Sequence, residues 1–169
     1  MALFLMLGAS FISSCNDDDD STPISEESTL IGYYAGFTTG SSTHFQNLKM
    51  PNVTDTVIVA ASAKNNTNFD ITYKSAYWGT ALFENVQLVK SSNANAWEVK
   101  ASTEGTIKMP YRNPAATEVT YKDYQATLAS GTISSTATKG TNWERAQFTI
   151  EANLGERAGI YTLVFDTKE

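Results

Sequence analysis

The chain has 169 residues, of which 41% are hydrophobic and 18% charged, and its formal net charge at pH 7 is -6. This composition is typical of one globular domain with a sizeable core, and the acidic excess comes from Asp17–Asp20, Glu26 and Glu27, with no Lys or Arg before Lys49. The remainder is neutral overall and lacks the clustered basic face that nucleic acid requires, so we expect no nucleic-acid partner.

The first fourteen residues, MALFLMLGASFISS, carry no charge and are apolar from Ala2 to Leu7. About 20 apolar residues are needed to cross a bilayer. This segment is shorter, and its length is that of the hydrophobic region of a signal peptide. We therefore expect residues 1–14 to be a lipoprotein signal peptide that is removed on export.

Cys15 is the only cysteine of the chain, and two serines precede it. The stretch ISSC resembles a bacterial lipobox, in which the cysteine thiol takes a diacylglyceryl group and becomes the first residue after cleavage. Each buried methylene of an acyl chain contributes about 0.8 kcal/mol, so several chains anchor a protein stably. The alternative is an ordinary buried cysteine, while one cysteine excludes a disulfide within the chain. We expect lipidation at Cys15, with the membrane as a partner through this anchor.

The next residues, NDDDDSTPISEES, contain four consecutive carboxylates and no apolar periodicity. Like charges repel one another and favour an extended, solvated chain, so residues 15–29 are predicted to be the lipidated cysteine and a flexible acidic tether. The acidic run after the cysteine also resembles the surface-export signal of Bacteroidetes lipoproteins. That resemblance implies an outer-membrane lipoprotein exposed at the cell surface, with a periplasm-facing lipoprotein as the alternative.

From residue 30 onward the dominant hydrophobic period is two, which is the period of a half-buried β-strand. In RAQFTIEANL the even-numbered residues from Ala146 to Leu154 are apolar, and the odd-numbered ones are polar. Links rich in Asn, Gly and Ser separate such runs, as turns require. Eight strands are predicted, at 30–38, 53–63, 68–75, 79–90, 96–109, 118–130, 142–154 and 158–167.

Sequential antiparallel strands with short links predict an all-β fold for residues 30–169, a single up-and-down β-barrel of about eight strands whose closure removes exposed sheet edges. Side chains fill the interior of such a barrel, or it holds one small ligand. A two-sheet β-sandwich is the alternative. Locally, Gly105 predicts a bend or bulge, and a change of phase between Tyr121 and Tyr124 predicts a bulge. The stretch STHFQNLKM could form a single turn or a short helix.

Four stretches, GYYAGF, YKSAYWGTALFENV, YQATLASGTIS and IYTLVF, together resemble the calycin-like (lipocalin-like) β-barrel lipoproteins of Bacteroidetes. The resemblance covers most of residues 30–167 and rests chiefly on Gly32, Tyr33, Gly36, Trp78, Gly79 and Phe83. It implies a lipocalin-like barrel on an exported lipoprotein and brings no catalytic residues. DSTP and DTV also resemble O-glycan acceptor sites of exported Bacteroidetes proteins, at Ser21 and Thr56.

Few residues offer catalytic or metal chemistry. His44 is the only histidine, whereas a zinc site needs three or four ligands. Haem could be held by His44 with Met50 or Met109, but packing of these methionines in the core is the simpler interpretation. A hydrolase could use paired carboxylates, drawn from Glu84, Glu98, Glu104, Asp123, Glu144 and Glu151. Because most of these acids fall on polar strand faces, we expect no enzymatic activity, no cofactor and no metal.

Aromatic residues are the better indication of binding, because a rigid ring with a polar tip suits sugars and flat apolar ligands. Tyr73, Trp97 and Tyr121 are the candidates for ligand-facing rings, with core packing as the competing interpretation. We therefore expect a non-catalytic binding module for a small ligand or glycan at the barrel mouth, which predicts a cavity lined by rings. An accessory subunit of a surface protein complex is the alternative and predicts a filled barrel with an exposed apolar patch.

Overall fold

The computed structural model describes residues 29–50, 53–92, 95–111, 118–135 and 144–167. The strands in these ranges are β1 (Gly32–Ser41), β2 (Leu48–Lys49), β3 (Asp55–Ala61), β4 (Phe69–Ser75), β5 (Gly79–Val86), β6 (Leu88–Lys90), β7 (Ala96–Val99), β8 (Thr103–Tyr111), β9 (Thr120–Ser134), β10 (Arg145–Asn153) and β11 (Ile160–Asp166). Within them, the structure contains no helix with the length and apolarity to cross a membrane. Cys15, the expected signal peptide and most of the expected tether lie outside the described residues.

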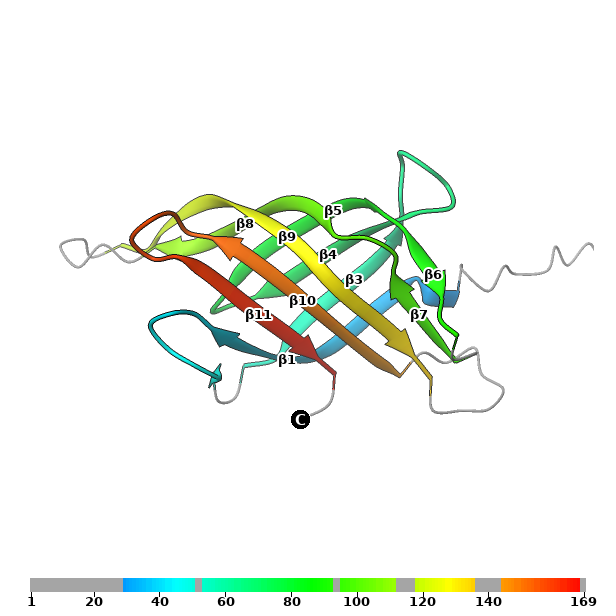
Figure 1. The fold of residues 1–169 in the computed structure, drawn as a ribbon, viewed down its shortest axis with the longest axis horizontal. Coiled ribbons are helices and arrows are strands. Elements are labelled where there is room, and N and C mark those ends of the chain that lie inside the picture. Colours follow the sequence, from blue (N-terminus) through cyan, green and yellow to red (C-terminus); the bar gives the residue numbers. More distant parts are fainter. Residues whose placement is uncertain (1–28, 51–52, 93–94, 112–117, 136–143, 168–169) are drawn as a thin grey trace, which may run out of the picture.

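Eight strands form a closed antiparallel ring in the order β1, β3, β4, β5, β8, β9, β10 and β11, and β11 pairs with β1 to close it (Figure 1). β2 pairs with β1, whereas β6 and β7 pair with each other, and β7 also pairs with the end of β9. The predicted runs 79–90 and 96–109 therefore each contain two consecutive strands. The closed hydrogen-bonded ring confirms the predicted barrel, and the β-sandwich alternative is wrong.

The interior of the barrel is filled by side chains that alternate along the strands. In β10 the even-numbered residues, from Ala146 to Ala152, are buried as their period predicts. Tyr73, Phe83, Phe148 and Phe165 are the largest fully buried side chains, and they come from four different strands. These rings occupy the space in which a small barrel could otherwise hold a ligand.

β1 closes the barrel because it bends at Gly36. Residues from Gly32 to Gly36 pair with β3, whereas residues from Phe37 to Ser41 pair with β11. A Cβ at residue 36 would lie 2.3 Å from the carbonyl oxygen of Asp166. Only glycine allows this close approach of two backbones, so Gly36 permits β1 to pass from one neighbour to the other.

The barrel has two different ends. At the closed end, on the right in Figure 1, the chain enters through Leu30, which is fully buried, and Tyr34 Oη donates a hydrogen bond of 2.8 Å to the Leu30 carbonyl. Burial raises the pKa of Tyr34 to about 12. The mouth end, on the left, carries residues 42–47, the β4–β5 turn, the overhanging ends of β8 and β9, and the β10–β11 turn.

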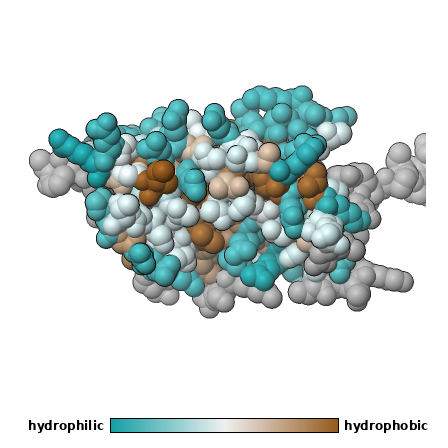
Figure 2. Space-filling view, viewed as in Figure 1, coloured by the Kyte–Doolittle hydropathy of each residue, from teal (hydrophilic) through white to brown (hydrophobic). Residues whose placement is uncertain are grey.

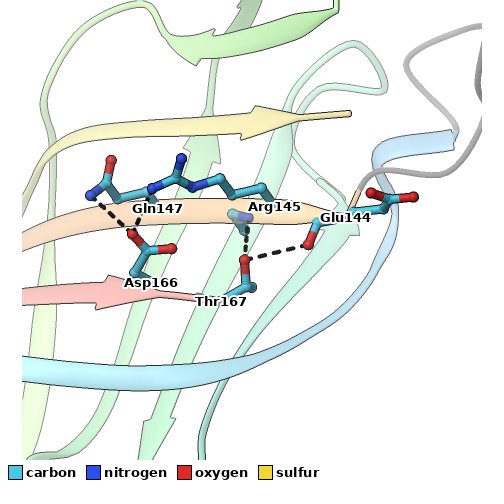
Figure 3. A network of polar contacts seen from close by, with 6 residues as sticks. Glu144, Arg145, Gln147, Asp166 and Thr167 are labelled. Carbon is cyan, nitrogen blue, oxygen red and sulfur yellow. Dashed lines mark hydrogen bonds and ion pairs between the residues drawn. The ribbon is translucent and has the colours of Figure 1, made fainter. Parts of the chain in front are cut away.

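A polar network fastens β10 to β11 at the closed end (Figure 3). Asp166 Oδ2 forms an ion pair with Arg145 Nη2 at 3.0 Å and accepts a hydrogen bond from Gln147 Nε2 at 3.3 Å. Thr167 Oγ1 accepts a hydrogen bond of 3.1 Å from the backbone N–H of Ala146. The C-terminal end of β11 is therefore fixed beside the bend of β1.

Two local predictions on the long strands were wrong. The β8–β9 pairing is regular from Thr120 to Leu128, and the register shift lies farther along β9, opposite Thr149 and Ile150. The phase change near Tyr121 needs no bulge, because this part of β9 overhangs the barrel and buries neither face completely.

Gly105 also forms no bend, since it pairs regularly with Ala126 in the β8–β9 ladder. The interruption lies instead at residues 100–102, between β7 and β8. Gly105 is required for another reason, because a Cβ there would lie 2.3 Å from the carbonyl oxygen of Leu82. Residues 42–47 form bends without a helical turn, and β2 follows them.

Candidate functional site

The mouth end is organised around Trp78, which lies in the β4–β5 turn and is 3% exposed. Ser75 fixes the turn, because its Oγ accepts hydrogen bonds from the backbone N–H groups of Tyr77 (3.2 Å) and Trp78 (3.0 Å). Gly79 follows with a φ of +99°, a conformation that favours glycine. The sequence from Ser75 to Gly79 therefore reverses the chain and directs the indole into the end of the barrel.

The indole of Trp78 spans the mouth from β5 to β1, where it lies against the backbone of Gly40. A Cβ at residue 40 would lie 2.3 Å from Cη2 and 2.5 Å from Cζ2 of Trp78. Any larger residue at position 40 would therefore push the indole from its place.

Other aromatic rings surround Trp78. The Phe45 ring stacks on Trp78 with centroids 6.1 Å apart and meets the Tyr161 ring edge to face at 5.1 Å. The Tyr77 ring meets Trp78 edge to face at 4.8 Å. These four residues, Phe45, Tyr77, Trp78 and Tyr161, come from three separate segments and form what we call the mouth cluster. Offset-stacked and edge-to-face contacts of this kind stabilise aromatic pairs beyond their buried area.

A buried polar layer lies beneath the mouth cluster. Tyr73 Oη donates a hydrogen bond of 2.8 Å to Thr38 Oγ1, and the neighbouring Asp55 is 2% exposed. Burial, reinforced by the negative charge of Asp55, raises the pKa of the Tyr73 phenol well above its usual value, although hydrogen bonds with Thr38 and Ser75 oppose the shift. Tyr73 therefore stays protonated under ordinary conditions and acts as a hydrogen-bond donor within the layer.

Two polar atoms near this layer are buried without a hydrogen-bond partner among the described residues. They are Oδ1 of Asp55, an acceptor, and Nε1 of Trp78, a donor. Trp97 Nε1 is a third such atom, and it lies on β7, away from the mouth. More than nine in ten buried polar groups in proteins are paired, so each of these atoms needs an explanation.

The overhanging ends of β8 and β9 form one rim of the mouth. Ile107 and Met109 are buried, so Tyr111 lies on the same inward-directed face of β8. Across the ladder, Lys122 Nζ lies 3.8 Å from the centroid of the Tyr111 ring, which is a cation–π contact. This rim therefore presents an aromatic face and one positive charge.

Partly exposed hydrophobic side chains are concentrated at the mouth. Phe45, Tyr124, Leu154 and Tyr161 all pack against the core while remaining partly exposed. Side chains of this kind can cover the core and still contact a molecule in solution. Val99, on β7, is a fifth side chain of this kind, so most but not all of the partly exposed apolar surface of the described barrel lies at the mouth.

The three candidate ligand-facing rings lie in different environments. Tyr73 is fully buried beneath the mouth cluster, whereas Trp97 is buried beside β9 at the other end of the barrel. Tyr121 is 63% exposed and lies on the outer face of the overhang, because it alternates with the inward-directed Lys122 and Tyr124. The structure therefore does not bring the three rings together, and only Tyr73 adjoins the mouth.

His44 and the acidic candidates form no catalytic group. His44 Nε2 lies 3.4 Å from the Arg157 carbonyl oxygen, and its backbone N–H donates a hydrogen bond to Ser42 Oγ. The six carboxylates considered for hydrolysis are all exposed: Glu84, Glu98, Glu104, Asp123, Glu144 and Glu151. Within the described ranges, no group of three or more His, Cys, Asp or Glu side chains could hold a metal ion.

The sequence does not reveal the residues that build the mouth. Asp55 stands out only in the glycan-acceptor pattern DTV, and its inward direction follows from the alternation Asp55, Val57, Val59 along β3. That alternation was the available signal, because it places a carboxylate among core positions. Phe45 and Tyr161 meet only through barrel closure, which no local pattern encodes.

The fold defines the class of this protein, which is a closed, eight-stranded antiparallel β-barrel of the lipocalin-like kind with additional strands outside the ring. No family model matches the chain, and comparison with curated proteins and with solved structures gives no match either.

Proposed function

We propose that the barrel is a non-catalytic binding module that takes a small ligand or glycan at its mouth end. One observation carries the proposal: partly exposed rings directed inward gather at that end above a filled interior. Ligand sites are typically concave and aromatic with a few polar groups. The mouth cluster, Lys122 and the polar layer beneath offer the aromatic and polar groups of such a site.

The filled interior is the outcome expected for an accessory subunit, and it leaves a ligand only the mouth. Because Tyr73, Phe83 and Phe165 are fully buried within the barrel, the ligand lies across the mouth and not deep between the strands. Its first contacts are then with Phe45, Tyr161 and the rim. A shallow site of this kind favours a flat or compact molecule with one apolar face.

The proposal includes export as a Bacteroidetes-type lipoprotein of the calycin-like family, anchored through Cys15 and exposed at the cell surface. The sequence ISSC and the following acidic run support the anchor. The entry of the chain at the closed end supports an orientation in which the mouth points away from the membrane. Mass spectrometry of the native protein tests the anchor, and an unmodified Cys15 behind an intact leader would contradict it.

The binding proposal is tested by nuclear magnetic resonance with a panel of small sugars and flat aromatic compounds. We expect at least one compound to perturb the resonances of Phe45, Trp78 and Tyr161 in a saturable manner. Phe45→Ala should then weaken binding about tenfold, as the loss of one aromatic contact implies. Tyr33→Ala, on the outer face, is the matched control and should leave the affinity unchanged. Perturbations confined to the closed end or the outer face would refute the proposal.

A second candidate function is that of an accessory subunit in a surface complex, favoured by an uncharged row of cross-strand neighbours on the outer face. The row runs through Tyr33, Ile58, Thr72, Leu82 and Thr106, on five adjacent strands. Two of its hydrophobic residues, Tyr33 and Leu82, are 79% and 44% exposed. The face formed by β9, β10 and β11 differs, because its hydrophobic residues stand apart from one another (Figure 2).

The second candidate predicts that the native protein, extracted with mild detergent, migrates as a particle larger than the monomer. Leu82→Glu should dissociate that particle, because it buries a charge in an apolar contact. Thr149→Glu introduces the same charge on β10 and should have no effect. A monomer from the unaltered chain would exclude this function.

A further inference from the structure

The two unpaired atoms near the mouth are complementary to each other. Asp55 Oδ1 can only accept a hydrogen bond as a carboxylate oxygen, whereas Trp78 Nε1 can only donate one. Both side chains are more than nine-tenths buried. Since buried polar atoms are almost always paired, this donor and this acceptor call for an occupant that can serve both.

Ser75 relates the two residues through the backbone. Thr56 pairs with Lys74, so the antiparallel register sets Asp55 beside Ser75 across the β3–β4 ladder. Ser75 Oγ in turn accepts the backbone N–H of Trp78 at 3.0 Å. Asp55 and Trp78 therefore belong to the same end of the barrel and to neighbouring strand ends.

We infer that the ligand of the mouth is a neutral carbohydrate whose hydroxyl groups donate to Asp55 Oδ1 and accept from Trp78 Nε1. This inference rests on the proposed function and names the class of ligand. A hydroxyl group is both donor and acceptor, and neighbouring hydroxyls of one sugar ring can serve two protein atoms at once. The C–H face of the ring can pack on Phe45 or Tyr161, whose ring faces carry partial negative charge.

Other ligand classes fit these atoms less well. A purely apolar molecule would leave both atoms unpaired, and sites built for hydrogen bonding reject ligands that lack the matching groups. An acidic sugar would bring its carboxylate toward Asp55, and like charges repel in a site of low dielectric constant. The two atoms therefore select for neutral hydroxyl groups.

The sugar reaches the two atoms where Phe45 now lies. Phe45 stacks on Trp78 and belongs to the irregular residues 42–47, whose backbone N–H groups form hydrogen bonds within residues 41–47. Ser42 N–H donates to the Phe45 carbonyl at 2.8 Å, and Asn47 N–H donates to Ser41 Oγ at 3.0 Å. The Phe45 ring can therefore shift onto the face of a sugar without breaking a strand of the ring.

The test uses the chain labelled with nitrogen-15 and the indole N–H resonance of Trp78, assigned by its loss in Trp78→Phe. The probes are methyl α-glucopyranoside, methyl α-mannopyranoside, N-acetylglucosamine, glucuronate and toluene. We expect at least one neutral sugar to shift this resonance saturably, and glucuronate and toluene to leave it unchanged. Maltose and cellobiose test whether the site takes a free sugar or the end of a glycan. Only a site for the end of a glycan should bind a disaccharide more tightly than a monosaccharide.

Two variants and a matched control complete the experiment, with affinity followed through the Tyr161 resonances. Asp55→Asn removes the charge that strengthens the hydrogen bond, and Trp78→Phe removes the donor while keeping a ring. Each should weaken sugar binding about tenfold or more. Trp97→Phe removes the other buried, unpaired indole N–H, at the opposite end, and should leave the affinity unchanged.

The outcomes separate this inference from the proposed function. Sugar binding at the mouth that neither variant weakens overturns the inference and leaves the binding module in place. Binding of toluene without any neutral sugar does the same. If no probe perturbs the mouth, both the inference and the proposed function fail.

Discussion

The two ends of the barrel are built differently. At the closed end, Leu30 is fully buried, and Tyr34 Oη donates a hydrogen bond to the Leu30 carbonyl. The Asp166 network connects the last two strands. At the mouth end, aromatic rings remain partly exposed, and an acceptor and a donor are buried unpaired. Trp97 Nε1 is also unpaired, but among the described residues it has no unpaired acceptor at its own end of the barrel.

Under the proposed function, this difference separates an end that stabilises the fold from an end that binds. Unpaired buried polar atoms cost about 1–3 kcal/mol each, and exposed rings give up part of their possible burial. Proteins commonly sacrifice stability at the sites they use. The closed end holds the fold, so the mouth can retain unfavourable features.

The largest expected effect comes from Leu30→Ala at the closed end. Removal of a fully buried leucine should lower the free energy of unfolding by about 2–5 kcal/mol, through lost burial and the cavity left behind. Phe45→Ala at the mouth should cost only about 1 kcal/mol, because that ring is partly exposed and contributes mainly its ring contacts. Urea denaturation measures both.

Ile31→Ala is the control for Leu30→Ala, since Ile31 is 46% exposed and adjacent in sequence. It should change the free energy of unfolding by a small fraction of the Leu30 effect. Equal costs for Leu30→Ala and Phe45→Ala would contradict the assignment of stability to the closed end.

The next effect concerns Gly40 beneath Trp78. Gly40→Ala places a methyl group against the indole, and such overpacking should cost about 1–3 kcal/mol. The tryptophan fluorescence spectrum should shift, because the indole must move toward solvent. Gly32→Ala, where a Cβ meets no atom within 4 Å, is the control and should alter neither stability nor fluorescence. An unchanged spectrum for Gly40→Ala would show that the indole does not span the mouth.

The sequence predicted the barrel well because strand patterns are local. The alternation from Ala146 to Ala152 and the turn residues between runs predict eight runs, each of which overlaps one strand of the ring, and closure then follows from the cost of exposed edges. The local prediction was wrong where burial stops. Around Tyr121 neither face of β9 packs against the core, so the hydrophobic pattern there does not report the strand geometry.

The candidate site was much less predictable, because it depends on contacts between distant segments. Phe45 and Tyr161 are far apart in the chain, and their contact requires β11 to return to β1. Tyr73 and Trp97 are both buried, as the period of two predicts, but Trp97 lies at the other end of the barrel. Period-two patterns indicate which face a ring takes, and they do not indicate which end of a barrel it reaches.

A third prediction compares the two buried phenols at alkaline pH. Tyr34 has its pKa raised from 10.0 to about 12, so its proton stays on in the folded state while the unfolded state loses it. The part of the free energy of unfolding that comes from this pKa difference is fully present below pH 10 and is lost as pH rises from 10 toward 12. At pH 11 the loss is about 1.4 kcal/mol, and Tyr34→Phe should abolish that part of the pH dependence.

Tyr73→Phe should flatten the same profile, since the pKa of Tyr73 is also raised, by burial and by Asp55. Urea denaturation at pH 8, 10 and 11 provides the measurement, and pH 8 is the reference at which both phenols are protonated in either state. If neither substitution changed the pH profile, the two phenols would have the same pKa in the folded and the unfolded state.

The smallest expected effect separates two ion pairs. Asp166 accepts bonds from both Arg145 and Gln147 and is only 21% exposed, so Asp166→Ala should cost about 1 kcal/mol, a value that salt screening reduces. Glu84 pairs with Lys64 in an exposed hairpin, and Glu84→Ala should have no measurable effect. Parallel urea denaturations in 0.05 M and 1 M NaCl, concentrations set by the screening length, distinguish the two. If Glu84→Ala cost as much as Asp166→Ala, the network would be ordinary surface pairing, and the closed end would owe its stability to the Leu30 core alone.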